Sequence, residues 1–245
     1  MALRVFAAVE IQPVEGGVAT GTVSPKRPDY TRLHTNQAAM ELFFAAALAA
    51  MAFWTMRSQE QGRRIALLGR HLARHQIEKH METLTQGYLR ALGEDDAERR
   101  DRIWLLLGGT ERALRSQFAR MAADFASTDA VQARASKLPF YLPFATRFAP
   151  AATFDMRRAL ALHARAIERA MDDAGASPRD RAFTISAELL LMQHTCHWFC
   201  RSRMMASART LARHKTSYDQ LIAAVSPQTR AEYLALTGLG RAGRA

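Results

Sequence analysis

The sequence predicts an all-α protein: an irregular helical bundle, divisible into two lobes, with one strongly apolar N-terminal helix and a flexible N-terminal arm before it. Apolar residues recur at helical spacing through most of the chain after residue 37, and the period-two alternation typical of strands is absent there. Ser-Pro pairs that favour helix starts, and glycines that favour helix ends, separate the helical segments.

Composition narrows the class of protein. The 245 residues are 49% hydrophobic and include two cysteines, which excludes a disulfide-stapled miniprotein and a wholly disordered chain. The net charge is +11, and all but four of the 34 basic residues are arginine. This excess of positive charge predicts acidic partners: a protein and an anionic membrane surface, with nucleic acid as the alternative.

An apolar segment at residues 38–56 is the strongest single signal. Its 19 residues, AAMELFFAAALAAMAFWTM, contain one charge, at Glu41, and end near Trp54. About 20 apolar residues span the hydrocarbon of a bilayer, and Trp is enriched at its interface. The segment therefore predicts a transmembrane helix. Before it, residues 1–37 contain several Pro and Gly and predict a flexible arm with a short strand at Val5–Ile11.

Basic residues set the expected orientation of this helix. Since an excess of positive charge marks the cytoplasmic side, we expect a protein of the inner (cytoplasmic) membrane whose C-terminal domain is cytoplasmic. The alternative is a soluble cytoplasmic protein with residues 38–56 as its buried central helix, because such a helix is also apolar on all sides. The flanking residues are Arg57, Arg63, Arg64, Arg70 and Arg74 after the segment, and Lys26, Arg27 and Arg32 before it.

Residues 57–137 predict the first helical lobe. Its expected elements are a long helix over Ser58–Leu92 that Gly93 ends, a second over Glu98–Leu107 that Gly108 and Gly109 break, a third that Thr110 caps, and a short turn or helix over Ser127–Ser136.

The segment 138–150, LPFYLPFATRFAP, interrupts the helices. Its three prolines prevent a regular helix, and its aromatic side chains favour burial. Two hypotheses follow: a connector between the lobes, or a loop that dips into a membrane interface or a partner's groove. The aromatic residues are Phe140, Tyr141, Phe144 and Phe148.

Residues 151–236 predict the second lobe, followed by a loose tail at 237–245. The expected helices are one that Thr153 caps and Gly175 ends, one that starts at Ser177-Pro178 and runs to about Arg213, and one that starts at Ser226-Pro227. The first of these carries an apolar stripe of Met156, Leu160, Ala164, Ile167 and Met171.

Two groups of residues have the chemistry of metal ligands. Imidazole, carboxylate and thiolate groups one helical turn apart can bind zinc or iron. Each group falls on one face of a predicted helix, although a solvated polar face explains the first as well, and ordinary core contacts explain the second. The groups are His71, His75, Glu78 and Glu82, and Cys196, His197 and Cys200.

A basic stretch without acidic residues predicts an anion-binding surface that could neutralise phosphates of lipid or nucleic acid. The alternative is a solvated helix face. The residues are Arg201, Arg203, Arg209, Arg213 and Lys215.

Motifs for nucleotide hydrolysis, dinucleotide binding and serine hydrolysis are absent, so no catalytic residue is predicted and an enzyme is disfavoured. We favour a membrane-associated helical adaptor or scaffold with a basic cytoplasmic domain, working in a bacterial envelope or transfer machine. The alternatives are a soluble helical protein that binds nucleic acid or an acidic partner, and a helical metalloenzyme. No cofactor is expected under the first two hypotheses, whereas the third requires zinc or iron.

Overall fold

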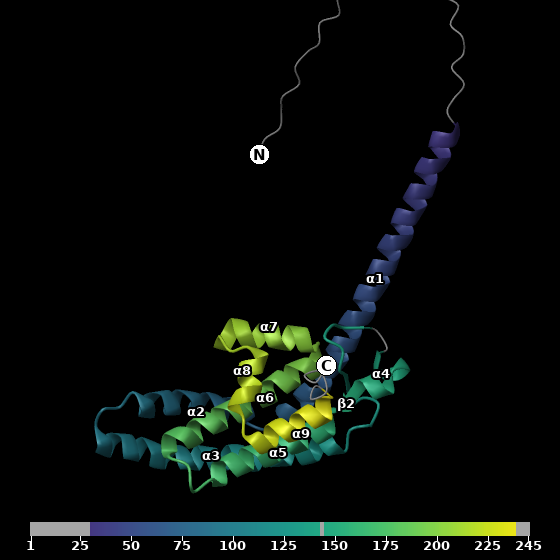
Figure 1. The fold of residues 1–245 in the computed structure, drawn as a ribbon. Helices are drawn as coiled ribbons and strands as arrows, with labels where there is room; N and C mark the ends of the chain where they lie inside the picture. Colours follow the sequence, from purple (N-terminus) through teal and green to yellow (C-terminus); the bar gives the residue numbers. More distant parts are fainter. Residues whose placement is uncertain (1–29, 143–144, 239–245) are drawn as a thin grey trace, which may run out of the picture. The chain divides into compact units, whose positions relative to one another are not determined.

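The computed structural model describes residues 30–142 and 145–238, so the predicted strand at Val5–Ile11, Phe144 and most of the tail lie outside the described residues. By internal contacts the chain divides into two units, Met1–Leu48 and Ala49–Ala245, and the first helix contributes to both. The elements (Figure 1) are α1 (Tyr30–Leu72), α2 (Ile77–Leu92), α3 (Ala97–Ala126), β1 (Arg134–Ser136), α4 (Ala145–Phe148), a 3-10 turn at Pro150–Ala152, β2 (Thr153–Asp155), α5 (Met156–Asp172), α6 (Pro178–Cys200), α7 (Arg203–His214), α8 (Tyr218–Ala224) and α9 (Pro227–Thr237).

The predicted all-α class is confirmed, with one small exception. In the described part of the chain, β1 and β2 form a two-stranded antiparallel sheet in which Ala135 faces Phe154. The expectation that no strand follows residue 37 is therefore wrong. The expected turn over Ser127–Ser136 is found up to Ala133, whereas Arg134–Ser136 form β1. Strands of three residues are too short to leave a recognisable alternation in the sequence.

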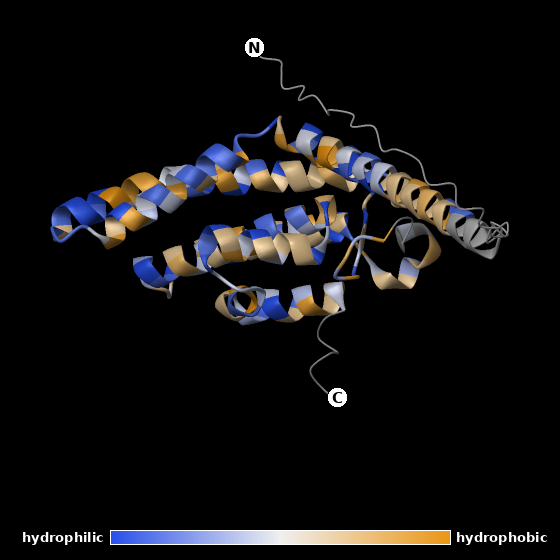
Figure 2. Cartoon of the chain, turned by 90° about the horizontal axis from the view of Figure 1, so that it is seen from above, coloured by the Kyte–Doolittle hydropathy of each residue, from blue (hydrophilic) through white to orange (hydrophobic). Residues whose placement is uncertain are grey.

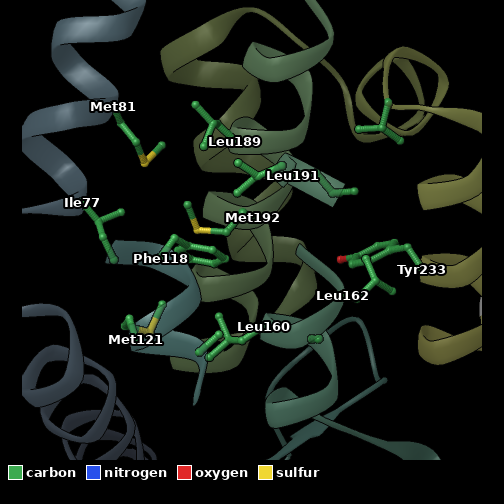
Figure 3. Packing of buried hydrophobic residues seen from close by; sticks show 14 of the residues in the cluster. Ile77, Met81, Phe118, Met121, Leu160, Leu162, Leu189, Leu191, Met192 and Tyr233 are labelled. Atoms are coloured by element: carbon green, nitrogen blue, oxygen red, sulfur yellow. The ribbon is translucent and has the colours of Figure 1, made fainter. Parts of the chain in front are cut away.

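One hydrophobic cluster fills the second unit, Ala49–Ala245. Side chains from α2, α3, α5, α6 and α9 point into it (Figure 3), so the helices of the two expected lobes share this core. The division into lobes itself stays a prediction. Fully buried members of the cluster include Leu84, Leu114, Phe118, Met121, Leu160, Leu191, Phe199 and Tyr233.

Helix α6 is the central helix of this core. Its buried residues occupy most of its circumference, and α5, α7, α8, α2 and β1 all contact it, whereas the strip through Phe183, Leu190 and His197 is exposed or partly exposed. Its predicted start is confirmed, because the Ser177 hydroxyl accepts the Asp180 backbone N–H and Pro178 occupies the first turn. Its predicted end near Arg213 is wrong. The Ser202 hydroxyl accepts the Met205 backbone N–H and so starts a separate helix, α7.

The long helix expected over Ser58–Leu92 is also interrupted. Helix α1 includes residues 30–37, which were expected in the arm, and ends at Leu72, while α2 starts at Ile77. In the break, the Gln76 backbone N–H donates to the Gln117 Oε1 at 2.6 Å, so a side chain of α3 replaces an acceptor within the helix. Gly93 ends α2 as predicted.

Helix α3 runs through Gly108 and Gly109, where the sequence predicts a break and a new start at Thr110. Each glycine costs a helix about 1 kcal/mol. Burial of Leu107 before the glycines and Leu114 after them on the same core offsets this cost. Helices α2 and α3 lie side by side as an antiparallel hairpin (Figure 1). A Cβ atom at Gly87 of α2 would meet the Leu107 side chain at 2.3 Å, so the glycine permits a close approach.

Two further helix starts test the predicted caps. Thr153 lies in β2, and Asp155 caps α5 instead, its carboxylate accepting the Arg157 backbone N–H. The Asp155 carboxylate reaches the first turn of α5 because β2 ends at Asp155 and α5 begins at the next residue. Ser226 caps α9 as predicted. In the predicted stripe of α5, Met156, Leu160 and Ile167 are buried, whereas Ala164 and Met171 are partly buried.

We expect Phe118→Ala to lower the free energy of unfolding by about 3–5 kcal/mol, because it removes a fully buried ring from the core. Phe183→Ala is the matched control, since this ring is 63% exposed, and its effect should stay below about 1 kcal/mol. Chemical denaturation of the full chain in mild detergent measures both. Equal losses for the two variants would contradict the core as described.

Candidate functional site

The apolar part of α1 is exposed along its whole length. Every residue from 39 to 56 is exposed, and hydrophobic colours dominate this part of the helix in Figure 2. Among the described residues, the helix over Ala39–Leu72 is long and apolar enough to cross a membrane, and none of its most apolar window is buried. The central buried position that the alternative assigns to residues 38–56 is occupied by α6 instead.

The aromatic segment after residue 137 contacts α1 at the C-terminal end of these apolar residues and just beyond it. The Tyr141 ring lies edge-on to Phe53, with ring centroids 6.1 Å apart, and the Arg57 guanidinium lies 5.8 Å from the Tyr141 centroid. The Tyr141 hydroxyl donates to Glu60 Oε2 at 2.6 Å. Burial and Glu60 raise the pKa of Tyr141, so the phenol stays protonated as a donor.

Close to its contact with Tyr141, helix α1 also binds the C-terminal end of α6. Arg64 donates to the Phe199 carbonyl oxygen at 3.1 Å and pairs with Glu60 at 2.6 Å. Its guanidinium also lies 5.6 Å from the Phe199 ring centroid. Glu60 therefore joins Arg64 and Tyr141, and we name the residues Phe53, Arg57, Glu60, Arg64 and Tyr141 the collar.

Large apolar side chains near the collar remain exposed to solvent. Trp54 is 67% exposed, and three side chains of the segment 138–150 are exposed as well. Aromatic side chains are enriched where membrane-spanning helices meet the interface. The three side chains are Phe140, Leu142 and Phe148.

The predicted anion-binding residues lie at the end of α6 and along α7. No ion pair to a carboxylate is found for any of them within residues 30–142 and 145–238. Burial, together with the charges of three of these arginines, lowers the pKa of His197. The structure places Arg201 after α6, Arg203, Arg209 and Arg213 on α7, and Lys215 at the α7 C-cap with φ 55°.

The histidine–glutamate group does not share one helix, contrary to prediction. The break between α1 and α2 separates His71 from Glu78 and Glu82. The His71 ring lies 5.1 Å from the Phe125 ring, and His75 Nε2 lies 3.5 Å from Asp124. The chain leaves α1 after Leu72, and the Gln76 backbone N–H bonds to Gln117 of α3 instead of to an acceptor in its own helix. The four residues therefore do not follow one continuous helix.

The cysteine group lies on α6 as predicted. Burial raises the pKa of both thiols, that of Cys200 to about 11, which disfavours the thiolate that binds metals. Cys196 Sγ lies 3.8 Å from the sulfur of Met192. Among the residues that the structure places, no group of three or more His, Cys, Asp or Glu could hold a metal ion. This arrangement gives no support to the metalloenzyme hypothesis.

Buried histidines stabilise the core around α6. His163 Nε2 and the Tyr233 hydroxyl each lie 3.0 Å from the Thr195 hydroxyl, and His194 Nε2 lies 3.1 Å from Ser207 Oγ. Burial lowers the pKa of His163 to about 3 and that of His194 to about 4, so both are neutral at pH 7.

A cavity of about 820 Å³ lies between β1, β2, α5 and α9, and its residues were missed by the sequence analysis. Arg157 pairs with Asp155, and Arg165 pairs with Glu232. The other cations that line it have no carboxylate partner in the described part of the chain. A sequence scan could not find them, because they are distributed between two segments that only the β1–β2 pairing brings together. They are Arg134, Lys137 and Arg158.

Comparison of the chain with protein-family models, with curated proteins and with solved structures finds no match. The functional argument therefore depends on the geometry of the chain's own residues.

We expect acid to destabilise the protein through His163 and His194. The unfolded chain binds these protons near pH 6.5, the folded chain only near pH 3 and 4, so stability falls as the pH drops below 6.5. The slope is up to about 1.4 kcal/mol per pH unit for each histidine. His163→Gln should reduce this slope in unfolding curves recorded from pH 7 to pH 4. If the stability of the variant and that of the native protein fell equally with decreasing pH, His163 would not be a source of the acid sensitivity.

Proposed function

We propose that this protein is a membrane-anchored helical adaptor, with α1 as a transmembrane anchor and the basic bundle on the cytoplasmic side. The observation that carries the proposal is the uninterrupted exposure of residues 39–56, which contain one charge. Exposed apolar surface of this extent is unfavourable in water and favourable in hydrocarbon.

The collar supports the same proposal. On α1 it extends from Phe53, in the last turn of the apolar segment, to Arg64, which is where a spanning helix would leave the hydrocarbon and where Tyr and Trp are favoured. Its two arginines, and those that follow on α1, have the charge bias of a cytoplasmic flank. Of the two hypotheses for residues 138–150, this placement favours the loop at a membrane interface.

A protein partner is the second part of the proposal. The end of the α2–α3 hairpin carries apolar side chains in solvent, and such surfaces often bind proteins. Together with the absence of recognisable catalytic motifs, they support an adaptor, in a bacterial envelope or transfer machine, more than an enzyme. The exposed side chains are Leu89, Leu92, Leu105 and Leu106.

We expect the protein to remain in the membrane fraction after washing with carbonate and with high salt. Leu48→Arg should weaken insertion about 100-fold, because an arginine near the centre of a spanning helix costs about 3 kcal/mol. Leu105→Arg is the matched control, since Leu105 is exposed on α3 and lies outside the anchor. Release of the native protein by carbonate, or equal behaviour of the two variants, would refute the anchor.

The cavity between the sheet, α5 and α9 favours a second function, the binding of an acidic peptide. Its unpaired cations lie beside apolar residues of α5 and α9, so it offers charge and apolar contact together. Ala161, Leu162 and Leu236 form the apolar side.

For this second function, we expect a labelled oligo-aspartate peptide to bind the full chain in a salt-dependent manner. Arg134→Gln and Arg158→Gln should each weaken binding about threefold, the value of a partly exposed ion pair. Arg179→Gln, on the exposed start of α6, is the control that should leave the affinity unchanged. Fluorescence anisotropy at several salt concentrations measures all three variants, and an equal loss in the control would count against the cavity.

A further inference from the structure

A cavity of about 520 Å³ lies beside α1, at the C-terminal end of the apolar segment and along the turns that follow it. One wall is formed by α1 from Trp54 to Ile65, and the other by Arg201, which follows α6. All of these residues belong to the unit Ala49–Ala245. The lining residues on α1 are Trp54, Arg57, Ser58, Gln61, Gly62 and Ile65.

The cavity is positively charged and contains no acidic residue. Arg57 and Arg201 have no carboxylate partner among the described residues, whereas Arg64 nearby is neutralised by Glu60. The Tyr141 ring holds the Arg57 guanidinium without neutralising it. Two unpaired guanidinium groups at the edge of one cavity fit an anion with several oxygen atoms, such as a phosphate.

A buried donor in the wall gives an independent indication of a ligand. Gln61 is only 9% exposed, and its Nε2 has no hydrogen-bond partner. A buried amide N–H without an acceptor costs about 1–3 kcal/mol. Because Gln61 lines the cavity, an oxygen of a bound molecule is a candidate acceptor for this donor.

We propose that this cavity binds the phosphate of an anionic phospholipid headgroup, with Arg57 and Arg201 as its charge partners and Gln61 as a donor. This inference rests on the proposed anchor, because the anchor places the cavity at the level of lipid headgroups. Trp54, at the hydrocarbon end of the cavity, contacts the glycerol region of the same lipid. The site selects anionic lipid because it holds two positive charges and no compensating carboxylate.

The test measures lipid binding to the full chain in detergent by native mass spectrometry, with phosphatidylglycerol and phosphatidylcholine as probes. The native protein should retain phosphatidylglycerol preferentially. Arg57→Gln and Arg201→Gln should each weaken this binding about tenfold, as expected for a lost charge-assisted hydrogen bond. Arg63→Gln is the matched control, because Arg63 is an exposed arginine of the same helix outside the cavity.

A steric variant tests the cavity without changing its charge. A Cβ atom at Gly62 would meet no atom within 4 Å, so Gly62→Leu should fold normally and fill the site. We expect it to weaken phosphatidylglycerol binding as strongly as the arginine variants. Circular dichroism, with the helical signal of the native chain as reference, verifies that each variant is folded.

Three outcomes would overturn the proposal: equal retention of the two lipids, an equal loss in Arg63→Gln, or full binding by Gly62→Leu. Displacement of the lipid by an equal concentration of inorganic phosphate would also overturn it, by assigning the site to free phosphate. Failure of the anchor is measured separately, by carbonate extraction of the native protein. Selective lipid binding by a protein that carbonate releases would refute the anchor and leave the headgroup site in place.

Discussion

Burial of most of the surface of α6 is the constraint on which the rest of the bundle depends. A helix that buries residues over most of its circumference needs neighbours in several directions, and α5, α7, α8, α2 and β1 supply them. Helix α7 begins anew after Ser202, whose hydroxyl accepts the Met205 backbone N–H, and Arg203 in its first turn lies over the Trp198 ring.

Polar groups give this core its specificity. The Thr195 hydroxyl lies within hydrogen-bond distance of both His163 and Tyr233, so side chains of α5, α6 and α9 meet at this hydroxyl. Glu188 on α6 accepts the Ser226 backbone N–H at 3.1 Å and so fixes the start of α9. Burial raises the pKa of Glu188 despite these contacts. Such groups are costly when their partners are missing, and they therefore favour one arrangement of the helices.

Local chemistry predicts some elements of the fold well and others poorly. Ser177-Pro178 and Ser226-Pro227 start helices because a cap and a fixed φ act within one turn. The break after Leu72 and the continuity of α3 through Gly108 depend on contacts with distant residues. The apolar segment of α1 was predicted from composition alone. Its contact with Tyr141 was not, because residues about 80 positions apart leave no joint signal in a single sequence.

The close approach at Gly87 has a consequence for the α2–α3 hairpin. Glycine has a hydrogen atom where every other residue has a Cβ atom, so α2 and α3 approach each other more closely at Gly87 than a larger residue would allow. A methyl group there would displace Leu107, which directly follows the exposed Leu105 and Leu106. The surface that the hairpin offers to another molecule therefore depends on the absence of a side chain at Gly87.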